Sequence, residues 1–334
     1  MSRPLRPAAL PVRDGVSASC AAVGDADAGA ALLDFLARRL PAVSRSEWAQ
    51  RLMAGEVLDA HGQPLAPMQR CLPGQRVFYY RQIAREPMPA DAPRIVFQDE
   101  WLVVADKPHF MPVTPSGPFI QRSLMVQLKQ RLGLADLNPL HRIDRDTAGL
   151  VLFAVQPHTR DAYQALFRER RVRKRYQAVA AHPPGLSLPR THRSRIVDDP
   201  ERFFLCREEP GTPNSETELA LARVFELPGL GAHALYELHP VTGKRHQLRL
   251  HMMALGMPIL GDAFYPRVLH AEGEADDTAR PLQLLARAIA FTDPVTGQAR
   301  QFTSSLHLAA ARGLWPSNEN GCSARPSSAS SYSF

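Results

Sequence analysis

The amino-acid sequence predicts an α+β protein in which a small domain precedes a large one. Most apolar segments are short and rich in β-branched residues, which favours strands, and few of them alternate strictly with helices. The chain has 334 residues, of which 45% are hydrophobic, so it is long enough to bury two cores of unequal size. A Pro-rich linker at 86–93 marks the boundary between the two domains.

Charge and cysteine content narrow the class of protein without naming a function. The net charge of +7 predicts only a weak attraction to polyanions, because basic proteins without nucleic-acid partners are common. The four cysteines have no paired spacing, which argues against a zinc site or a disulfide framework and favours a reducing, cytoplasmic setting. No apolar run approaches the roughly 18 residues of a membrane span, so we expect no membrane partner.

The small domain is expected at 29–85, after a flexible arm at 1–28. Helical spacing of apolar residues predicts a helix that ends at Pro41, Ser44 is a suitable cap for a second helix, and 57–77 is typical of short strands. This order resembles, in degenerate form, the S-four type of ribosomal-protein RNA-binding module. The resemblance implies phosphate contacts from four arginines, whereas the alternative is a helical cap with a solvated basic face. These arginines are Arg38, Arg39, Arg45 and Arg51.

The large domain is expected at 94–312, followed by a disordered tail at 313–334. Periodicity and caps predict helices at 124–132, 161–167 and 243–255. Strands are expected at 95–97, 101–105, 150–155, 176–180, 217–225, 234–238 and 282–291. The polar, Pro-containing stretch at 182–215 is expected to form a long hairpin or surface loops.

Asp144 lies in the loop that leads into the predicted strand 150–155. Turn-forming residues such as Asp146 make the entry to that strand sharp. Arg142 and Arg145 flank Asp144, and neighbouring positive charge keeps a carboxylate ionised, which suits a nucleophile or a general base. The alternative is an aspartate that only caps backbone N–H groups, which is the commoner role of aspartate in a turn.

A dense basic run at 168–175 carries six basic residues against one acid and leads directly into Tyr176. Interleaved basic and aromatic residues can hold single-stranded RNA, because charge follows the backbone and a ring stacks on a base. The alternatives are a solvated helix face for the run and a plain core position for Tyr176.

Arg249 falls near the start of the helix predicted at 243–255, with Thr242 as its expected cap. An arginine near a helix N-terminus is poorly placed for the dipole, so it needs a carboxylate or phosphate partner.

His246 and His251 are five residues apart and would point in different directions on a helix or a strand, so no metal site is expected there.

Three segments resemble the motifs of the RluA-type pseudouridine synthases, in the order found in that family. They are His141-Arg142-Ile143-Asp144 with Thr147-Ala148-Gly149, Lys174-Arg175-Tyr176, and Thr242-Gly243-Lys244 with His246-Gln247-Leu248-Arg249 and His251. Ile143, Ala148 and Lys244 replace the usual Leu, Ser and Arg. Lys107-Pro108 and Gly261-Asp262 also match. The resemblance implies a long, mostly antiparallel mixed sheet with surrounding helices and a central cleft.

The resemblance assigns the catalytic role to Asp144, base stacking to Tyr176, and pairing with Asp144 to Arg249. It also places several basic or polar side chains near the RNA: His141, Arg142, Arg145, Lys174, Arg175 and Lys244. The implied reaction isomerises specific uridines to pseudouridine in a stem-loop of large-subunit rRNA or tRNA. It needs no cofactor or metal, and we expect a monomer.

Two other classes of function remain open from the sequence. One is a non-catalytic RNA-binding or ribosome-assembly protein, in which the Asp144 loop is structural. The other is a metal-dependent nuclease or phosphoesterase with His141, Asp144 and Asp146 as ligands.

Overall fold

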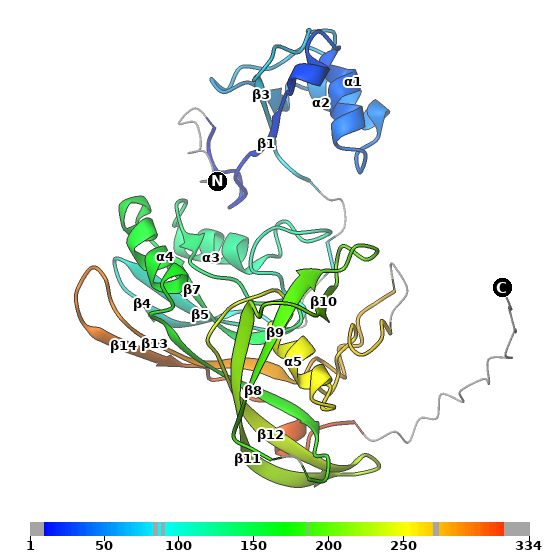
Figure 1. The fold of residues 1–334 in the computed structure, drawn as a ribbon. Coiled ribbons are helices and arrows are strands. Elements are labelled where there is room, and N and C mark those ends of the chain that lie inside the picture. Colours follow the sequence, from blue (N-terminus) through cyan, green and yellow to red (C-terminus); the bar gives the residue numbers. More distant parts are fainter. Residues whose placement is uncertain (1–9, 83–85, 88–90, 186, 270–273, 317–334) are drawn as a thin grey trace, which may run out of the picture.

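The computed structural model describes residues 10–82, 86–87, 91–185, 187–269 and 274–316. A small N-terminal unit lies above a larger unit built on one long sheet (Figure 1). The α+β class predicted from the sequence is confirmed. Most of the expected C-terminal tail and parts of the expected linker lie outside the described residues. Within those residues, no helix has the length and apolar character needed to cross a membrane.

The N-terminal unit packs two helices against a three-stranded sheet. Its elements are β1 (Ser19–Ala22), α1 (Leu32–Arg39), α2 (Arg45–Met53), β2 (Val57–Leu58) and β3 (Arg76–Tyr79), with sheet order β1-β3-β2. Ser44 caps α2 as predicted, because its hydroxyl accepts the Glu47 N–H at 3.2 Å. Phe35, Leu36 and Trp48 are fully buried in the core of this unit.

Residues 10–28 are not the flexible arm that the sequence predicts. β1 pairs antiparallel with β3, and Leu10 is fully buried beside it. Val16 is buried in the core of the larger unit, together with apolar residues of helix α3 (Leu124–Leu132). The segment divides its few apolar residues between two cores, so it carries no single period from which order could be predicted.

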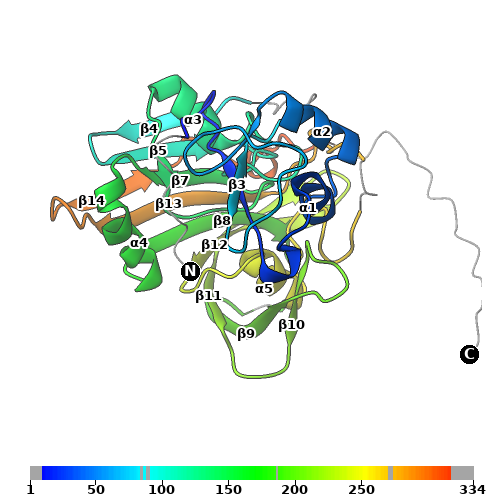
Figure 2. The same ribbon diagram turned by 90° about the horizontal axis from the view of Figure 1, so that it is seen from above.

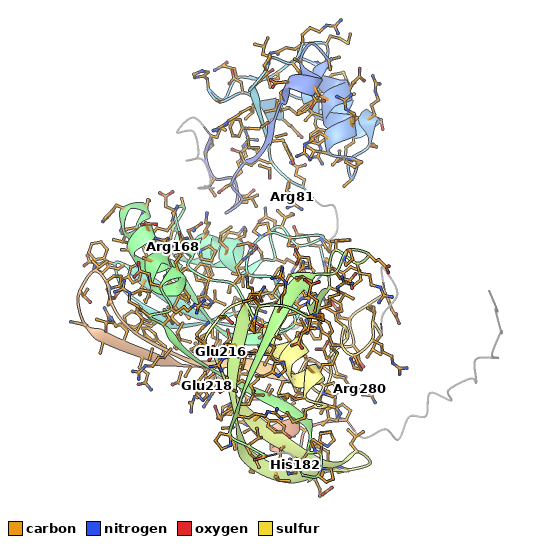
Figure 3. All side chains as sticks on the ribbon, in the orientation of Figure 1. Arg81, Arg168, His182, Glu216, Glu218 and Arg280 are labelled. Carbon is orange, nitrogen blue, oxygen red and sulfur yellow. The ribbon has the colours of Figure 1, made fainter. Side chains whose placement is uncertain are left out.

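Hydrogen bonds of Arg81 and Glu86 tie the N-terminal unit and its connection to the larger unit. Arg81, which Figure 3 shows between the units, donates to the Gly117 carbonyl at 3.3 Å. The Glu86 carboxylate accepts three backbone N–H groups of residues 120–122 at 2.8–2.9 Å, just before α3. The expected linker is therefore anchored at Glu86.

The larger unit is organised around a sheet of eleven strands in the described chain. In spatial order its main path is β10-β9-β11-β12-β8-β13-β7-β5-β4, with β14 on β13 and β6 on β7. All pairs are antiparallel except β7 with β13, so the sheet is mostly antiparallel and mixed, as the resemblance implies. The strands are β4 (Arg94–Gln98), β5 (Leu102–Lys107), β6 (Asn138–Pro139), β7 (Ala148–Ala154), β8 (Arg173–Ala181), β9 (Arg190–Asp198), β10 (Cys206–Glu209), β11 (Ser215–Leu227), β12 (Gly231–Pro240), β13 (Leu284–Thr292) and β14 (Ala299–Thr303).

Helices cover both faces of the central strands. α3 packs on the side chains of β5 and β7 that include Val103 and Val151. α4 (Arg160–Arg168) packs on the opposite set, which includes Val104 and Leu152. Alternate residues of a strand point to opposite faces, so these apolar strands are buried on both sides. α5 (Gln247–Ala254) lies against β8 and β12 (Figure 1).

The parallel pairing of β7 with β13 requires a glycine at position 149. Ala286 of β13 lies directly opposite Gly149, whose φ is +114°. A Cβ built at this position would lie 2.4 Å from the Ala286 carbonyl oxygen. Only glycine permits this approach, which brings the loop before β7 beside β13 and, across it, β8.

The helix predicted at 243–255 begins later than the sequence indicates, at Gln247 and not at Gly243. Thr242 does not cap it. Its hydroxyl accepts the Glu216 N–H at 2.8 Å and contacts Gln247 Oε1 at 2.7 Å, which ties the turn to β11. His246 takes a left-handed conformation immediately before the helix. The Thr242 side chain therefore bonds to Glu216 and Gln247, and it does not form the helix cap that the local sequence predicts.

Candidate active site

Asp144 lies on the loop that feeds β7, and a buried lysine holds that loop. The ammonium group of Lys107, at the end of β5, donates to the Arg145 carbonyl at 2.8 Å and to the Pro108 carbonyl at 2.9 Å. Lys107 is fully buried, and this burial lowers its pKa to about 7, although Asp146 and Asp144 act in the opposite direction. Lys107 therefore fixes the backbone next to Asp144.

Arg249 projects from α5 toward Asp144 and is held from behind by a second carboxylate. Its Nε and Nη2 donate to the two oxygens of Asp262 at 2.8 and 2.5 Å. Its Nη1 lies 3.7 Å from Asp144 Oδ2 and 4.0 Å from Asp146 Oδ2. Arg249 is only 1% exposed, and Nη1 has no hydrogen-bond partner among the described residues. The guanidinium group is thus fixed on one side and open toward Asp144.

The surroundings of Arg249 keep it charged in spite of its burial. Burial alone would lower its pKa, but hydrogen bonds and charge from Asp262, with further charge from Asp144, raise the pKa above its ordinary value. The rings of Phe264 and Tyr265 lie 4.7 and 5.4 Å from the guanidinium carbon. Asp262 accepts the backbone N–H groups of both aromatic residues, so one short turn builds the whole support.

Tyr176 and Lys174 extend from alternate positions of β8 into the same pocket. Burial, and after it the charge of Asp144, raises the pKa of Tyr176, so the phenol stays protonated. Lys174 donates to the Thr242 carbonyl at 3.1 Å, and burial lowers its pKa to about 8. A neutral ring and a cation therefore line one wall.

Asp144, Tyr176 and Arg249 converge on one pocket that is open to solvent. The pocket draws on the Asp144 loop, β8, β13 and the segment that leads into α5. Its lining residues are Arg142, Ile143, Asp144, Thr147, Lys174, Tyr176, Pro240, Thr242, Gly243, Lys244, His246, Gln247, Leu248, Arg249 and Leu284.

The basic residues predicted to bind RNA divide into two groups. Arg142 and Lys244 are exposed at the pocket, with Lys174 beside them. Arg145 does not line the pocket and pairs with Asp146 at 2.9 Å and with Asp276 at 2.6 Å. Arg175 is on the alternate face of β8 and lies 3.7 Å from Glu237.

The prediction that His141 faces RNA is not supported by its position. Its Nε2 accepts the Leu152 backbone N–H at 3.2 Å, and its ring stacks on Phe167 at 4.8 Å. Burial lowers its pKa to about 3, so the ring is neutral. The ring therefore supports the backbone of β7, and the position of His141 in the motif does not reveal this orientation.

The arginines of the N-terminal unit are largely paired with acids of the same unit. Arg38 pairs with Asp27, Arg45 with Asp34 at 2.9 Å, and Arg51 with Glu47. Arg39 is exposed and, in the described part of the chain, forms no ion pair. The basic face predicted from the sequence is therefore smaller than its arginine content implies.

His192, Glu208 and His251 form the one cluster of potential metal ligands in the described residues. Its members already form hydrogen bonds within the protein. His251 Nδ1 lies 2.9 Å from the Thr217 hydroxyl, whose oxygen also accepts a Gln247 N–H. His251 Nε2 lies within 3.1 Å of two serine hydroxyls, and His192 Nε2 lies 3.1 Å from Glu208 Oε1. The other proposed set, His141, Asp144 and Asp146, does not form such a cluster among these residues.

Two residues that shape the site had no role predicted from the sequence, although both lie in matched motifs. Lys107 and Asp262 act on Arg145 and Arg249, which are distant in the chain, so spacing could not show their partners. The sequence signal was only indirect, namely that Asp262 follows a glycine. In the structure Gly261 has a φ of +75° and lies close to Pro281, so it forms a constrained turn.

Comparison with known proteins identifies the class to which this fold and pocket belong. Residues 101–254 match the model of the RNA pseudouridylate synthase family. An uncharacterised RNA pseudouridine synthase of Synechocystis is 30% identical over 70% of this chain and 79% of its own. The dual-specificity RNA pseudouridine synthase RluA of Haemophilus influenzae is 31% identical over 63% of this chain and 91% of its own.

Solved structures agree at the level of the fold. Human RNA pseudouridylate synthase domain containing 1 superposes with a TM-score of 0.55 at 24% identity, covering 69% of this chain and 91% of that one. This chain belongs to the RluA-type family of RNA pseudouridine synthases. It is accordingly an isomerase that converts uridine to pseudouridine in RNA.

Proposed function

We propose that the pocket isomerises an unpaired uridine in an RNA stem-loop, with Asp144 as the catalytic carboxylate. The observation that carries the proposal is the buried Nη1 of Arg249, which finds no hydrogen-bond partner in the described part of the chain and faces Asp144 at 3.7 Å. A fixed, charged donor beside an ionised carboxylate is suited to stabilise charge changes at a reacting group.

We assign three residues of the pocket to the reaction. The bond from ribose carbon 1′ to ring nitrogen 1 breaks, the base turns, and a bond from carbon 1′ to carbon 5 forms. The carbon 5 proton leaves to water and nitrogen 1 gains a proton, so no group or electron comes from outside. Asp144 acts on the nucleoside, Arg249 holds Asp144, and the Tyr176 ring holds the detached base.

We propose that Arg142, Lys174 and Lys244 hold the phosphates around the extruded uridine. All three line the pocket, and two of them are exposed at it. Turning a base out of a stack costs a few kcal/mol, least where the base is already unpaired, which favours loops as substrates. Arg39 is exposed and can contact RNA phosphates. The N-terminal unit would therefore add affinity for RNA with little preference for sequence.

The proposed targets are stem-loops of large-subunit rRNA or tRNA. The relative named dual-specificity supports more than one RNA as substrate. We further propose that the protein is a cytoplasmic monomer.

The test uses purified protein and transcripts carrying tritium on uridine carbon 5. Incubation with tRNA and with fragments of 23S-type rRNA should release tritium to water at defined uridines. Mapping pseudouridine in total RNA from cells with and without the gene then identifies the targets. Release from neither RNA, with no site lost on removal of the gene, would overturn the proposed substrates.

A further inference from the structure

The loop between β9 and β10 carries an exposed aromatic side chain. β10 is an edge strand of the sheet and lies next to β9 and α5 (Figure 2). Phe203, in the connecting loop 199–205, is 84% exposed, more than any other large apolar side chain in the described residues. An exposed aromatic ring offers a partner a large, flat contact area.

The loop holds Phe203 in a defined place. Asp199 accepts the backbone N–H groups of Glu201 and Arg202, both at 2.9 Å, which closes a turn. Arg245 donates to the Phe203 carbonyl at 2.9 Å and to the Leu205 carbonyl at 2.6 Å. Backbone groups on both sides of the exposed ring are thus fixed by hydrogen bonds.

The loop is continuous with the pocket through Arg245 and a series of rings. Arg245 stands between Lys244 and His246, which both line the pocket. The ring of Phe203 lies 5.6 Å from that of Phe204, which lies 5.7 Å from that of Phe264. The Phe264 ring in turn covers the guanidinium group of Arg249. An apolar path therefore runs from the exposed ring to the residue that faces Asp144.

We propose that Phe203 is a stacking surface for a nucleotide adjacent to the target uridine. The inference rests on the proposed function and adds to it a specific RNA contact. When one base leaves the stack, its neighbour loses a stacking partner, and an exposed ring can replace it without reading sequence. Arg202, next to the ring, and Lys244, at the pocket, are exposed, as is the acidic Glu201. The other two acids of this region are engaged, because Asp198 pairs with Arg245 at 2.9 Å and Asp199 accepts two backbone N–H groups. The RNA that enters the pocket is therefore the occupant that we assign to the ring.

The experiment measures stacking and turnover with the full chain and a stem-loop substrate. 2-Aminopurine replaces the nucleotide on each side of the target uridine in turn. With wild type, fluorescence of one of the two probes should fall on binding; with Phe203→Ala this quenching should be lost. KM for the RNA should rise roughly tenfold while kcat changes little, and Phe203→Trp should restore both readouts.

Controls separate this inference from the proposed function and from a fold defect. Leu230→Ala, at the β11–β12 turn, removes another partly exposed apolar side chain and should change neither readout. Probe quenching does not require turnover, so it reports on Phe203 separately from the catalytic role proposed for Asp144. Unchanged quenching and KM in Phe203→Ala would overturn the inference. A dimer that wild type forms in sedimentation and that Phe203→Ala loses would also overturn the inference, because Phe203 would then be a contact between two copies of the chain.

Discussion

At Arg249, two carboxylates share one guanidinium group in unequal ways. Asp262 takes two hydrogen bonds at 2.5 and 2.8 Å, whereas Asp144 lies 3.7 Å from the remaining nitrogen. Asp262 therefore fixes Arg249, and Asp144 stays free to act on a substrate. The sequence predicted the pairing of Arg249 with Asp144 from family resemblance; the support by Asp262 is a long-range contact that no local pattern contains.

We predict that Asp262→Asn lowers kcat by about two orders of magnitude and leaves KM for RNA nearly unchanged. The amide still accepts the Phe264 and Tyr265 N–H groups but loses one charge-assisted bond to Arg249, which then shifts relative to Asp144. Single-turnover tritium release measures the rate, and a thermal melt confirms folding. Wild-type kcat in a folded variant would show that Asp262 does not position Arg249.

At the scale of elements, the site depends on where strands and loops meet at the centre of the sheet. Periodicity predicted most central strands and helix 124–132, because each buries a regular apolar face. It failed where a distant partner decides the local structure. Thr242 bonds to β11 and delays α5, and Leu10 and Val16 are ordered by two different cores. For the same reason, the sequence did not show that the His141 ring points inward and accepts the Leu152 N–H.

We predict that Gly149→Ala destabilises the protein far more than Gly297→Ala. Both glycines have positive φ, so both substitutions carry the strain of a left-handed alanine, about 1–2 kcal/mol. A Cβ at 149 also collides with Ala286 at 2.4 Å, whereas at 297 nothing lies within 4 Å. We expect Gly149→Ala to cost about 3 kcal/mol or more in urea unfolding. Equal losses for the two variants would argue against a tight β7–β13 approach.

At the scale of the whole molecule, three histidines are held as neutral rings: His251 is fully buried, and His109 and His141 are partly buried. Burial lowers the pKa of His141 and His251 to about 3 and that of His109 to about 4. In the unfolded chain a histidine titrates near its ordinary pKa of about 6.5. Between about pH 6.5 and 4 the unfolded chain therefore binds more protons than the folded one, and stability must fall as pH falls through that range.

We predict a loss of unfolding free energy on the order of 1.4 kcal/mol per pH unit for each of these histidines between about pH 6 and 4. Urea titrations at intervals of half a pH unit measure the slope. A His251→Asn variant should lose stability at pH 7 but show a shallower decline with acid. A flat stability profile from pH 7 to 4.5 would contradict the burial of neutral rings.

The Asp144→Asn variant tests most directly whether the Asp144 carboxylate acts on an extruded uridine. Asparagine keeps the shape of the side chain and removes the charge that faces Arg249. Tritium release from carbon 5 of the target uridine is measured in a single turnover, with RNA affinity determined on the same samples. We predict wild-type binding and no detectable release. Release at the wild-type rate would contradict the assignment of Asp144.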